Sequence, residues 1–240
     1  MNRKAGIQTP EDLRGKRIGV PEYQMTAAVW MRGFLADDYG VRAGDIEWVQ
    51  GGLEDAGRIP FEPVEPTGIK LGFAPKGLSL AQMLATGEID ALFAARSPST
   101  FLRTGGPVRR LFDDPWSIER DYFKRTRLFP IMHTISIRRE VLDANPWVAS
   151  TLLKAFSEAK DLAMADLTST SALPVSLPFM VEHTYQAMDL MGEDFWPYGL
   201  EPNRKTLETF VRYMREQGLI SEPMPVEMLF CPSTHRTFRI

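Results

Sequence analysis

The chain has 240 residues, of which 44% are hydrophobic and 25% are charged, and its formal net charge is -3. This composition is typical of globular proteins, and the length is sufficient for one large domain or two small ones. A slightly acidic chain without a basic cluster argues against nucleic acid as a partner. The single cysteine, Cys231, excludes an internal disulfide and a cage of thiolates around a metal.

No stretch reaches the roughly 18 consecutive apolar residues that a membrane-spanning helix needs, so we expect no membrane partner. The first six residues carry positive charge, but the apolar segment of a signal peptide does not follow them. We therefore predict a cytoplasmic protein.

Strands and helices alternate along the first half of the chain. The helix expected at 24–39 has apolar residues at helical spacing and ends at Gly40. Residues 54–67 contain three prolines and no periodicity, which predicts a loop. The alternation favours an α/β domain with a mainly parallel sheet. The other expected elements are a capped turn at 9–15, strands at 17–20, 46–49, 69–73, 88–94, 108–112 and 130–138, and helices at 80–86 and 116–126.

The second half of the chain is predicted to be helical, with helices at 147–167, 175–191 and 203–217 and a short last element at 226–230. The helix at 147–167 is amphipathic, and its apolar stripe is expected to be buried. Three helices and one strand do not make an obvious independent core. The stripe consists of Leu152, Leu153, Phe156, Ala159, Ala163 and Met164.

Five segments resemble the 4,5-dihydroxyphthalate decarboxylases and the binding-protein-like sequences related to them. The resemblance extends from about Gly6 to Pro232, and the segments at 21–26 and 132–134 are the more specific ones. The segment at 87–91 is shared with many solute-binding proteins. The five segments are 19–28, 45–52, 87–92, 129–134 and 191–199.

This resemblance implies an α/β fold of the periplasmic-binding-protein type II kind, with two lobes, a hinge and a ligand cleft. Members of the family are longer than this chain. Residues 1–130 would then form one complete α/β ligand-binding lobe. Residues 131–240 would supply a hinge strand and the C-terminal helices of the other lobe, whose first part is absent.

The activity implied by the resemblance is the decarboxylation of a dihydroxylated aromatic dicarboxylate, of the 4,5-dihydroxyphthalate to protocatechuate type, without a cofactor. One hydroxyl of this substrate is para to the leaving carboxylate. Loss of its proton pushes electrons onto the carboxyl-bearing carbon, which is protonated as carbon dioxide departs. The site must therefore hold two carboxylates, accept a phenolic proton and deliver a proton to carbon. The resemblance leaves open whether the chain forms a homo-oligomer.

The turn at 21–26 lies between a predicted strand and the N-terminus of a predicted helix. Free backbone N–H groups and the helix dipole favour an anion at such a position, and ligands of open α/β sheets bind where strands end. We therefore expect Tyr23, Gln24, Met25 and Thr26 to bind the substrate. An ordinary capped turn is the alternative.

Two further strand ends carry candidate substrate-binding residues. Gln50 and Gly51 end the second strand, where a glycine permits close approach of the backbone. Arg96 and Ser97 follow the apolar strand at 88–94, and a guanidinium can bind a carboxylate with two hydrogen bonds. The alternatives are a plain turn at Gly51 and an ion pair between Arg96 and a structural acid.

His133 is the first candidate for proton transfer, because it interrupts an apolar predicted strand and histidine titrates near neutral pH. The alternative is a histidine with a purely structural role. Glu22 is the second candidate, as a general base. His183 and His235 are expected to be structural or exposed. The three histidines lack the spacing of a known metal motif, so no metal is predicted, although acidic residues near His133 leave a divalent ion open.

A non-catalytic solute-binding protein for an aromatic acid or another small anion is the competing hypothesis. Both functions would use the turn and Arg96, so only the acid–base residues distinguish them.

Overall fold

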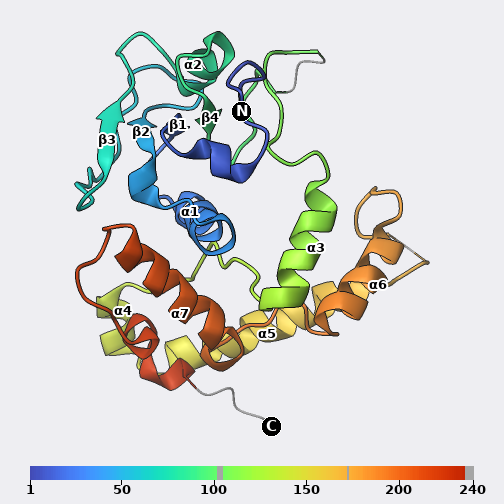
Figure 1. The fold of residues 1–240 in the computed structure, drawn as a ribbon. Helices are drawn as coiled ribbons and strands as arrows, with labels where there is room; N and C mark the ends of the chain where they lie inside the picture. Colours follow the sequence, from blue (N-terminus) through green and yellow to red (C-terminus); the bar gives the residue numbers. More distant parts are fainter. Residues whose placement is uncertain (102–104, 172, 236–240) are drawn as a thin grey trace. The chain divides into compact units, whose positions relative to one another are not determined.

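The computed structural model describes residues 1–101, 105–171 and 173–235 (Figure 1). The chain divides into two compact units. One, here called the sheet unit, consists of Met1–Pro115 and Thr209–Pro223; the other, the helical unit, consists of Trp116–Glu208 and Met224–Ile240. The expected boundary lay at residue 130, and the assignment of the two parts to lobes stays a prediction.

The sheet unit contains a four-stranded sheet in the order β3-β2-β1-β4, and all its strand pairs are parallel. This confirms the α/β class with a parallel sheet. In the register, Ile18 lies opposite Trp48 on one side and Ala91 on the other. The strands are β1 (Arg17–Val20), β2 (Glu47–Gln50), β3 (Lys70–Phe73) and β4 (Ala91–Leu92).

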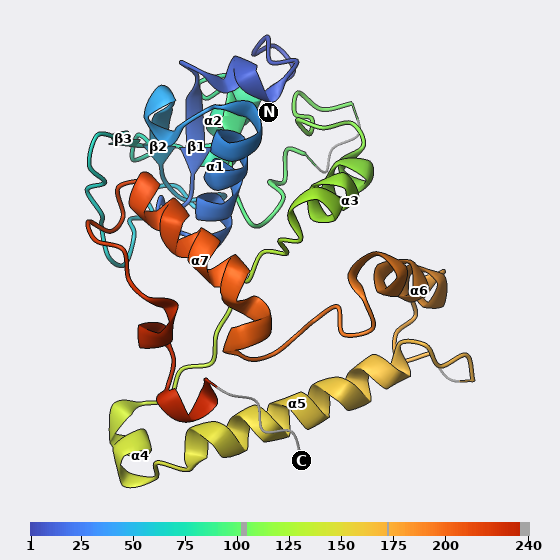
Figure 2. The same ribbon diagram turned by 60° about the horizontal axis from the view of Figure 1, so that its bottom comes forward.

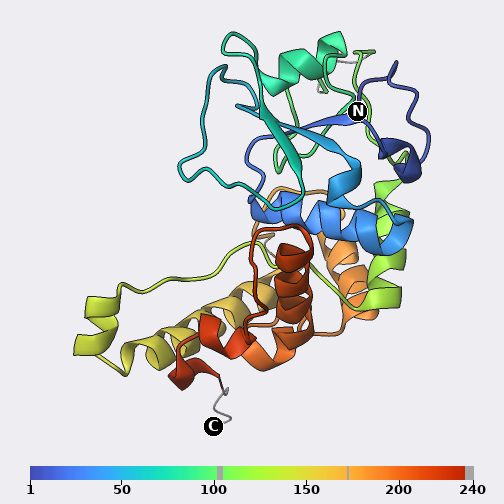
Figure 3. The same cartoon turned by 60° about the vertical axis from the view of Figure 1, so that its left-hand side comes forward.

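Helices cover both faces of this sheet. The strands lie between α1 (Thr26–Tyr39) and α2 (Leu80–Thr86) in Figures 1 and 3. Successive strand residues point to opposite faces. Val20 accordingly belongs to the apolar cluster that contains Leu35 of α1. Val49 belongs to the cluster that contains Leu84 of α2.

Local signals set the ends of α2 where they were predicted. The Ser79 hydroxyl accepts a hydrogen bond from the Gln82 N–H, and the Gln82 side chain accepts one from the Ser79 N–H. Gly87 ends the helix in the left-handed conformation, with φ of 87°. Helix α1 starts two residues later than expected, because Met25 still belongs to the preceding turn and donates to the Glu22 carbonyl.

The C-terminal part of α7 (Leu200–Glu216) belongs to the sheet unit and packs against α1 (Figure 2). The Tyr213 ring is fully buried and lies edge-on to Trp30, with centroids 5.6 Å apart. A Cβ atom on Gly33 would lie 2.2 Å from two atoms of the same ring. Only glycine therefore lets α7 approach this closely.

Two predicted strands are wrong, and a third is much shorter than expected. Residues 108–112 contribute one antiparallel bridge, between Val108 and Asn2, and residues 130–138 form no strand. A strand requires a neighbour with which to exchange backbone hydrogen bonds, and no described strand pairs with 130–138. The strand expected at 88–94 is reduced to β4, because the Glu88 N–H donates to the Met83 carbonyl and still belongs to the end of α2.

The helical unit confirms the long predicted helix but not its burial. Only Ala149 of α5 (Val148–Asp166) is buried. In the predicted stripe Phe156 is 40% exposed, Ala159 and Ala163 are exposed, and the other three residues are half-buried. The expected burial of the stripe is therefore wrong. The other helices are α3 (Pro115–Thr126), α4 (Arg139–Ala144), which was not predicted, and α6 (Met180–Met191).

Exposed apolar side chains are unevenly distributed between the two units. Among the described residues, Ile59, Phe61 and Phe73 are the exposed large hydrophobic residues of the sheet unit, and the others lie in the helical unit. None of the described helices has the length and apolar character of a membrane span. The remaining elements are the 3-10 turns η1 (Pro10–Leu13), η2 (Ala43–Asp45), η3 (Val226–Leu229) and η4 (Pro232–Thr234).

Candidate functional site

The sheet topology brings most of the predicted binding residues to one edge. The carboxyl ends of parallel strands meet at the same edge, and β1 has β2 on one side and β4 on the other. The turn at 21–25 follows β1, Gln50 ends β2, and Arg96 follows β4. The strand order reverses between β1 and β4, and doubly wound sheets bind ligands at such a point. The candidate site is therefore this edge.

Tyr23 anchors the turn after β1 through its backbone and its side chain. Its N–H donates to Gln50 Oε1 at 2.7 Å, and its carbonyl accepts from Arg32 Nη2 at 2.6 Å. Its hydroxyl donates to the Gln217 carbonyl at 3.1 Å. The ring is fully buried, and burial raises the pKa of the hydroxyl to about 12. These contacts show that Tyr23 holds the turn in place from its buried side. Direct contact of Tyr23 with a substrate stays a prediction.

The proline-rich loop at 54–67 lies against the same turn. Glu22 Oε1 accepts from Arg58 Nη2 at 2.7 Å, which makes an ion pair. Gln24 Nε2 donates to the Glu62 carbonyl at 2.7 Å, while its buried Oε1 has no partner among the described residues. Glu22, the candidate base, therefore sits beside a cation that sequence analysis did not identify.

Met25 and Thr26 occupy the start of α1. Met25 is the N-cap residue, and Thr26 is the first residue of the helix. Neither side chain is fully buried, and the first turn of a helix has N–H groups without partners inside the helix. The N-terminus of α1 therefore has its first N–H groups beside two side chains that are not fully buried, and its binding of an anion stays a prediction.

Arg32 is a buried cation of the sheet unit that sequence analysis missed. It is 1% exposed, and its guanidinium lies 3.8 Å from the centroid of the Tyr23 ring. Its Nε donates to Gln217 Oε1 at 2.7 Å. Burial lowers the pKa of Arg32 to about 10, so the side chain is still protonated at neutral pH. Its place on the apolar stripe that includes Ala28 and Leu35 was the available signal.

The Gln50–Gly51 pair has a clear structural role. Gln50 is 1% exposed and fixes Tyr23, while its Nε2 has no partner among the described residues. A Cβ atom on Gly51 would lie 2.8 Å from the Ala74 Cβ. Packing against Ala74 accounts for this glycine, and its contact with a ligand stays a prediction.

Arg96 and Ser97 lie on the exposed loop after β4. The Arg96 guanidinium has no ion-pair partner among the described residues, so the alternative of a structural ion pair finds no support there. Two residues further on, the Ser99 N–H and hydroxyl donate to the Glu54 carboxylate at 2.8 and 2.9 Å. These bonds join the loop after β4 to the loop after β2.

His133 belongs to the helical unit and lies in the irregular segment between α3 and α4. Its side chain is exposed. The strand that was expected to carry it does not form, and its role in proton transfer stays a prediction. In the part of the chain that the structure describes, no group of three or more His, Cys, Asp or Glu side chains could hold a metal ion.

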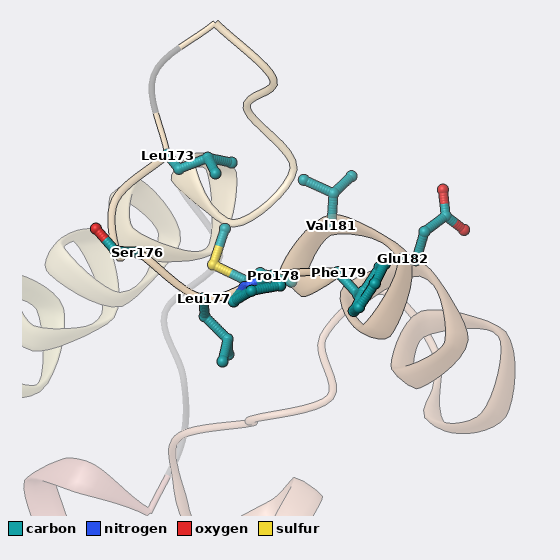
Figure 4. Close-up of a pocket in the computed structure, with 8 residues that line it drawn as sticks. Leu173, Ser176, Leu177, Pro178, Phe179, Val181 and Glu182 are labelled. Atoms are coloured by element: carbon teal, nitrogen blue, oxygen red, sulfur yellow. The ribbon is translucent and has the colours of Figure 1, made fainter.

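A pocket of about 450 Å³ lies in the helical unit, around the chain that leads into α6 (Figure 4). Its lining is mainly apolar, with Leu173, Leu177 and Phe179 among the side chains. Glu182 is the charged side chain among its lining residues. A negative charge and an apolar wall do not suit a dicarboxylate, so the candidate site remains at the edge of the sheet.

The fold and this edge define an α/β protein with a candidate small-anion site at the switch point of a parallel sheet. The chain is 43% identical over 236 residues to a 4,5-dihydroxyphthalate decarboxylase of Comamonas testosteroni, covering 98% of this chain and 72% of that protein. It is 43% identical over 120 residues to a 4,5-dihydroxyphthalate decarboxylase of Pseudomonas putida, covering 50% of this chain and 46% of that protein. No family model matches the chain. The chain belongs to the 4,5-dihydroxyphthalate decarboxylase family, which confirms the resemblance inferred from its motifs.

Proposed function

We propose that the chain is a carboxy-lyase that removes one carboxylate from a dihydroxylated aromatic dicarboxylate, as in the conversion of 4,5-dihydroxyphthalate to protocatechuate. The observation that carries this proposal is the 43% identity to a decarboxylase over 98% of the chain. The edge of the sheet supports it, because cationic side chains and a helix N-terminus lie there. We expect no cofactor, since the substrate itself supplies the electrons.

In this proposal the substrate binds by its carboxylates. One carboxylate would lie at the N-terminus of α1, where the first N–H groups and the helix dipole favour an anion. Arg96, exposed at the neighbouring strand end, would bind the other. A hydrogen bond from the Thr26 hydroxyl or the Gln24 amide would fix the orientation of the carboxylate at the N-terminus of α1. This arrangement fixes the ring while leaving its hydroxyls to the acid–base residues.

The chemical step requires a base and an acid. The base takes the proton of the hydroxyl para to the leaving carboxylate, and the electron pair of the O–H bond moves through the ring to the carboxyl-bearing carbon. That carbon takes a proton from the acid, and the C–C bond breaks so that carbon dioxide leaves. The electron pair of this bond returns through the ring to the phenolic oxygen, which takes back the proton from the base, and the ring becomes aromatic again. Glu22 and His133 are our candidates for these two transfers.

We further propose that the fold is of the periplasmic-binding-protein type II kind and that the enzyme is cytoplasmic. The doubly wound strand order supports the proposed fold. The exposed apolar side chains of the helical unit are consistent with helices that belong to a larger lobe. A binding protein for an aromatic acid is the second candidate function, because the anion-binding elements alone would serve it.

The test is to incubate the protein with 4,5-dihydroxyphthalate and to measure carbon dioxide and protocatechuate. His133→Ala should retain substrate affinity in calorimetry and lose carbon dioxide release. Glu22→Gln is the matched variant for the second acid–base candidate. If the unaltered protein binds the diacid without turnover, the binding function replaces the proposed one.

A further inference from the structure

Arg32 is a buried cation whose described contacts are all with neutral groups. Its guanidinium contacts two aromatic rings that pack against each other, 3.8 Å from the Tyr23 centroid and 5.2 Å from the Trp48 centroid. Of its hydrogen-bond acceptors in the described structure, one is the Gln217 side-chain oxygen and the other is the Tyr23 carbonyl. Both acceptors are neutral.

No described carboxylate forms an ion pair with Arg32. The contrast within the sheet unit is Arg212, which binds the Asp37 carboxylate at 2.6 Å on the surface of the same helix pair. A buried charge without a counter-charge is costly to the folded protein. Ionisable groups whose pKa is strongly shifted occur often at functional sites, where their charge acts on a ligand. The position of Arg32 beneath the turn that follows β1 indicates such a use.

Two buried donors near this turn remain unused. Arg32 Nη1 and Gln50 Nε2 have no partner among the described residues. Both side chains hold the backbone of Tyr23, Gln50 at its N–H and Arg32 at its carbonyl. Because a backbone N–H can only donate, the Gln50 oxygen must face Tyr23, and its amide nitrogen faces elsewhere. The buried polar atoms without a described partner around the turn are therefore two donors, one of them on a cation, and one acceptor, Gln24 Oε1. The two donors and the positive charge suit an acceptor-only group such as a carboxylate.

Gln217 fixes the guanidinium in this place. Its Oε1 accepts from Arg32 Nε, and its Nε2 donates to the Val29 carbonyl at 2.8 Å. Gln217 is 3% exposed, so both bonds are shielded from water. The amide thus aligns the plane of Arg32 with the carbonyl of Tyr23.

We propose that Arg32 is a positioning residue of the decarboxylase site, which holds the turn at 21–25 and supplies the positive charge that draws a substrate carboxylate to the N-terminus of α1. This inference rests on the proposed function for the identity of the anion. Arg32 acts by holding the turn and through the electric field of its charge. Gln50 is the second residue that holds the turn.

The test measures binding of phthalate, a dianion without the hydroxyls that the reaction needs, by calorimetry on the full chain. Arg32→Met should raise the phthalate Kd at least tenfold, and Arg32→Lys, which keeps the charge but cannot make both hydrogen bonds, should give a smaller rise. Tyr213→Phe is the control, because it removes another hydrogen bond between α1 and α7, the partly buried one from the Tyr213 hydroxyl to Asp37 Oδ2 at 2.6 Å. Its Kd should stay within twofold of the wild-type value.

Gln50→Glu keeps the oxygen that accepts from Tyr23 and replaces the unused donor with an acceptor, so it tests the inference even if Arg32→Met does not fold. It should also weaken phthalate binding at least tenfold. With 4,5-dihydroxyphthalate, Arg32→Lys should raise KM more than it lowers kcat. A purely structural role would instead lower the melting temperature and leave the phthalate Kd of the folded protein unchanged.

The inference is overturned if Gln50→Glu binds phthalate as the wild type does, if Arg32→Met and Tyr213→Phe change the Kd equally, or if the wild type does not bind phthalate. Failure of the proposed function gives a different result. In that case the wild type binds phthalate in an Arg32-dependent manner but releases no carbon dioxide from 4,5-dihydroxyphthalate.

Discussion

Gly33→Ala tests the close contact between α1 and the C-terminal part of α7. Two opposing effects determine the result. Alanine in place of glycine in a helix interior favours the helix by about 1 kcal/mol. The new Cβ would lie 2.2 to 2.5 Å from three atoms of the Tyr213 ring, which is closer than atoms in contact can be. Such overpacking costs about 1–3 kcal/mol, and contacts this short belong to the upper part of that range, at about 2–3 kcal/mol.

The ring cannot move aside easily, because it is fully buried and its hydroxyl binds Asp37. We therefore expect a net loss of about 1–2 kcal/mol in the free energy of unfolding, or roughly 2–8 °C in melting temperature. Thermal and urea unfolding followed by circular dichroism measure both quantities.

A double-mutant cycle isolates the cause. In the Tyr213→Leu background most of the ring is gone, so the same Gly33→Ala change should become neutral or stabilising. If Gly33→Ala alone leaves the protein as stable as the wild type, or if the cycle shows no coupling, the packing argument is refuted.

Three further results are expected. Glu22→Gln and Arg58→Ala both break the Glu22–Arg58 pair, and because Arg58 is largely exposed each should change the free energy of unfolding by less than about 1 kcal/mol. Only Glu22→Gln should abolish turnover. Equal kcat values for the two variants would exclude Glu22 as the base. The pKa of Tyr23 is raised above its unfolded value, so the neutral hydroxyl stabilises the fold fully below pH 10 and this contribution is lost as pH rises towards 12. In urea unfolding, the free energy of unfolding of the wild type should therefore fall by ~1 kcal/mol relative to that of Tyr23→Phe by pH 11. Parallel pH profiles of the two proteins would contradict this. Phe179 has φ of 63°, a left-handed conformation that is unfavourable for a residue with a side chain, and it is 77% exposed. Phe179→Gly should therefore stabilise the helical unit by about 1 kcal/mol and slow thermolysin cleavage next to α6. Faster cleavage would show that the ring contributes packing.

Features determined by neighbouring residues were predictable from the sequence. Ser79 and Gly87 gave the ends of α2, and the alternation of strands and helices gave the parallel sheet. The positions of Gln50 and Arg96 at the carboxyl edge followed from the same alternation. Only the order of the strands, which is a tertiary property, showed that both neighbour the turn after β1.

Features determined by distant residues were missed. The segment around His133 has the composition of a strand, but pairing depends on a neighbour that no local pattern reveals. The stripe of α5 has the right period, yet a period does not show what covers it. Arg32 escaped notice because its partner Gln217 is 185 positions away.

The division of the sheet unit into two stretches of chain has a consequence for its synthesis. Trp30 and Arg32 leave the ribosome long before the residues that bury them, and at 5–20 residues per second Gln217 follows Arg32 by roughly 10–40 s. During that interval the sheet and its first two helices can assemble, but the outer face of α1 stays open. We expect the nascent chain to hold an exposed tryptophan and an unshielded guanidinium until the last helix emerges, which makes α1 a site for chaperone binding before it becomes part of a decarboxylase.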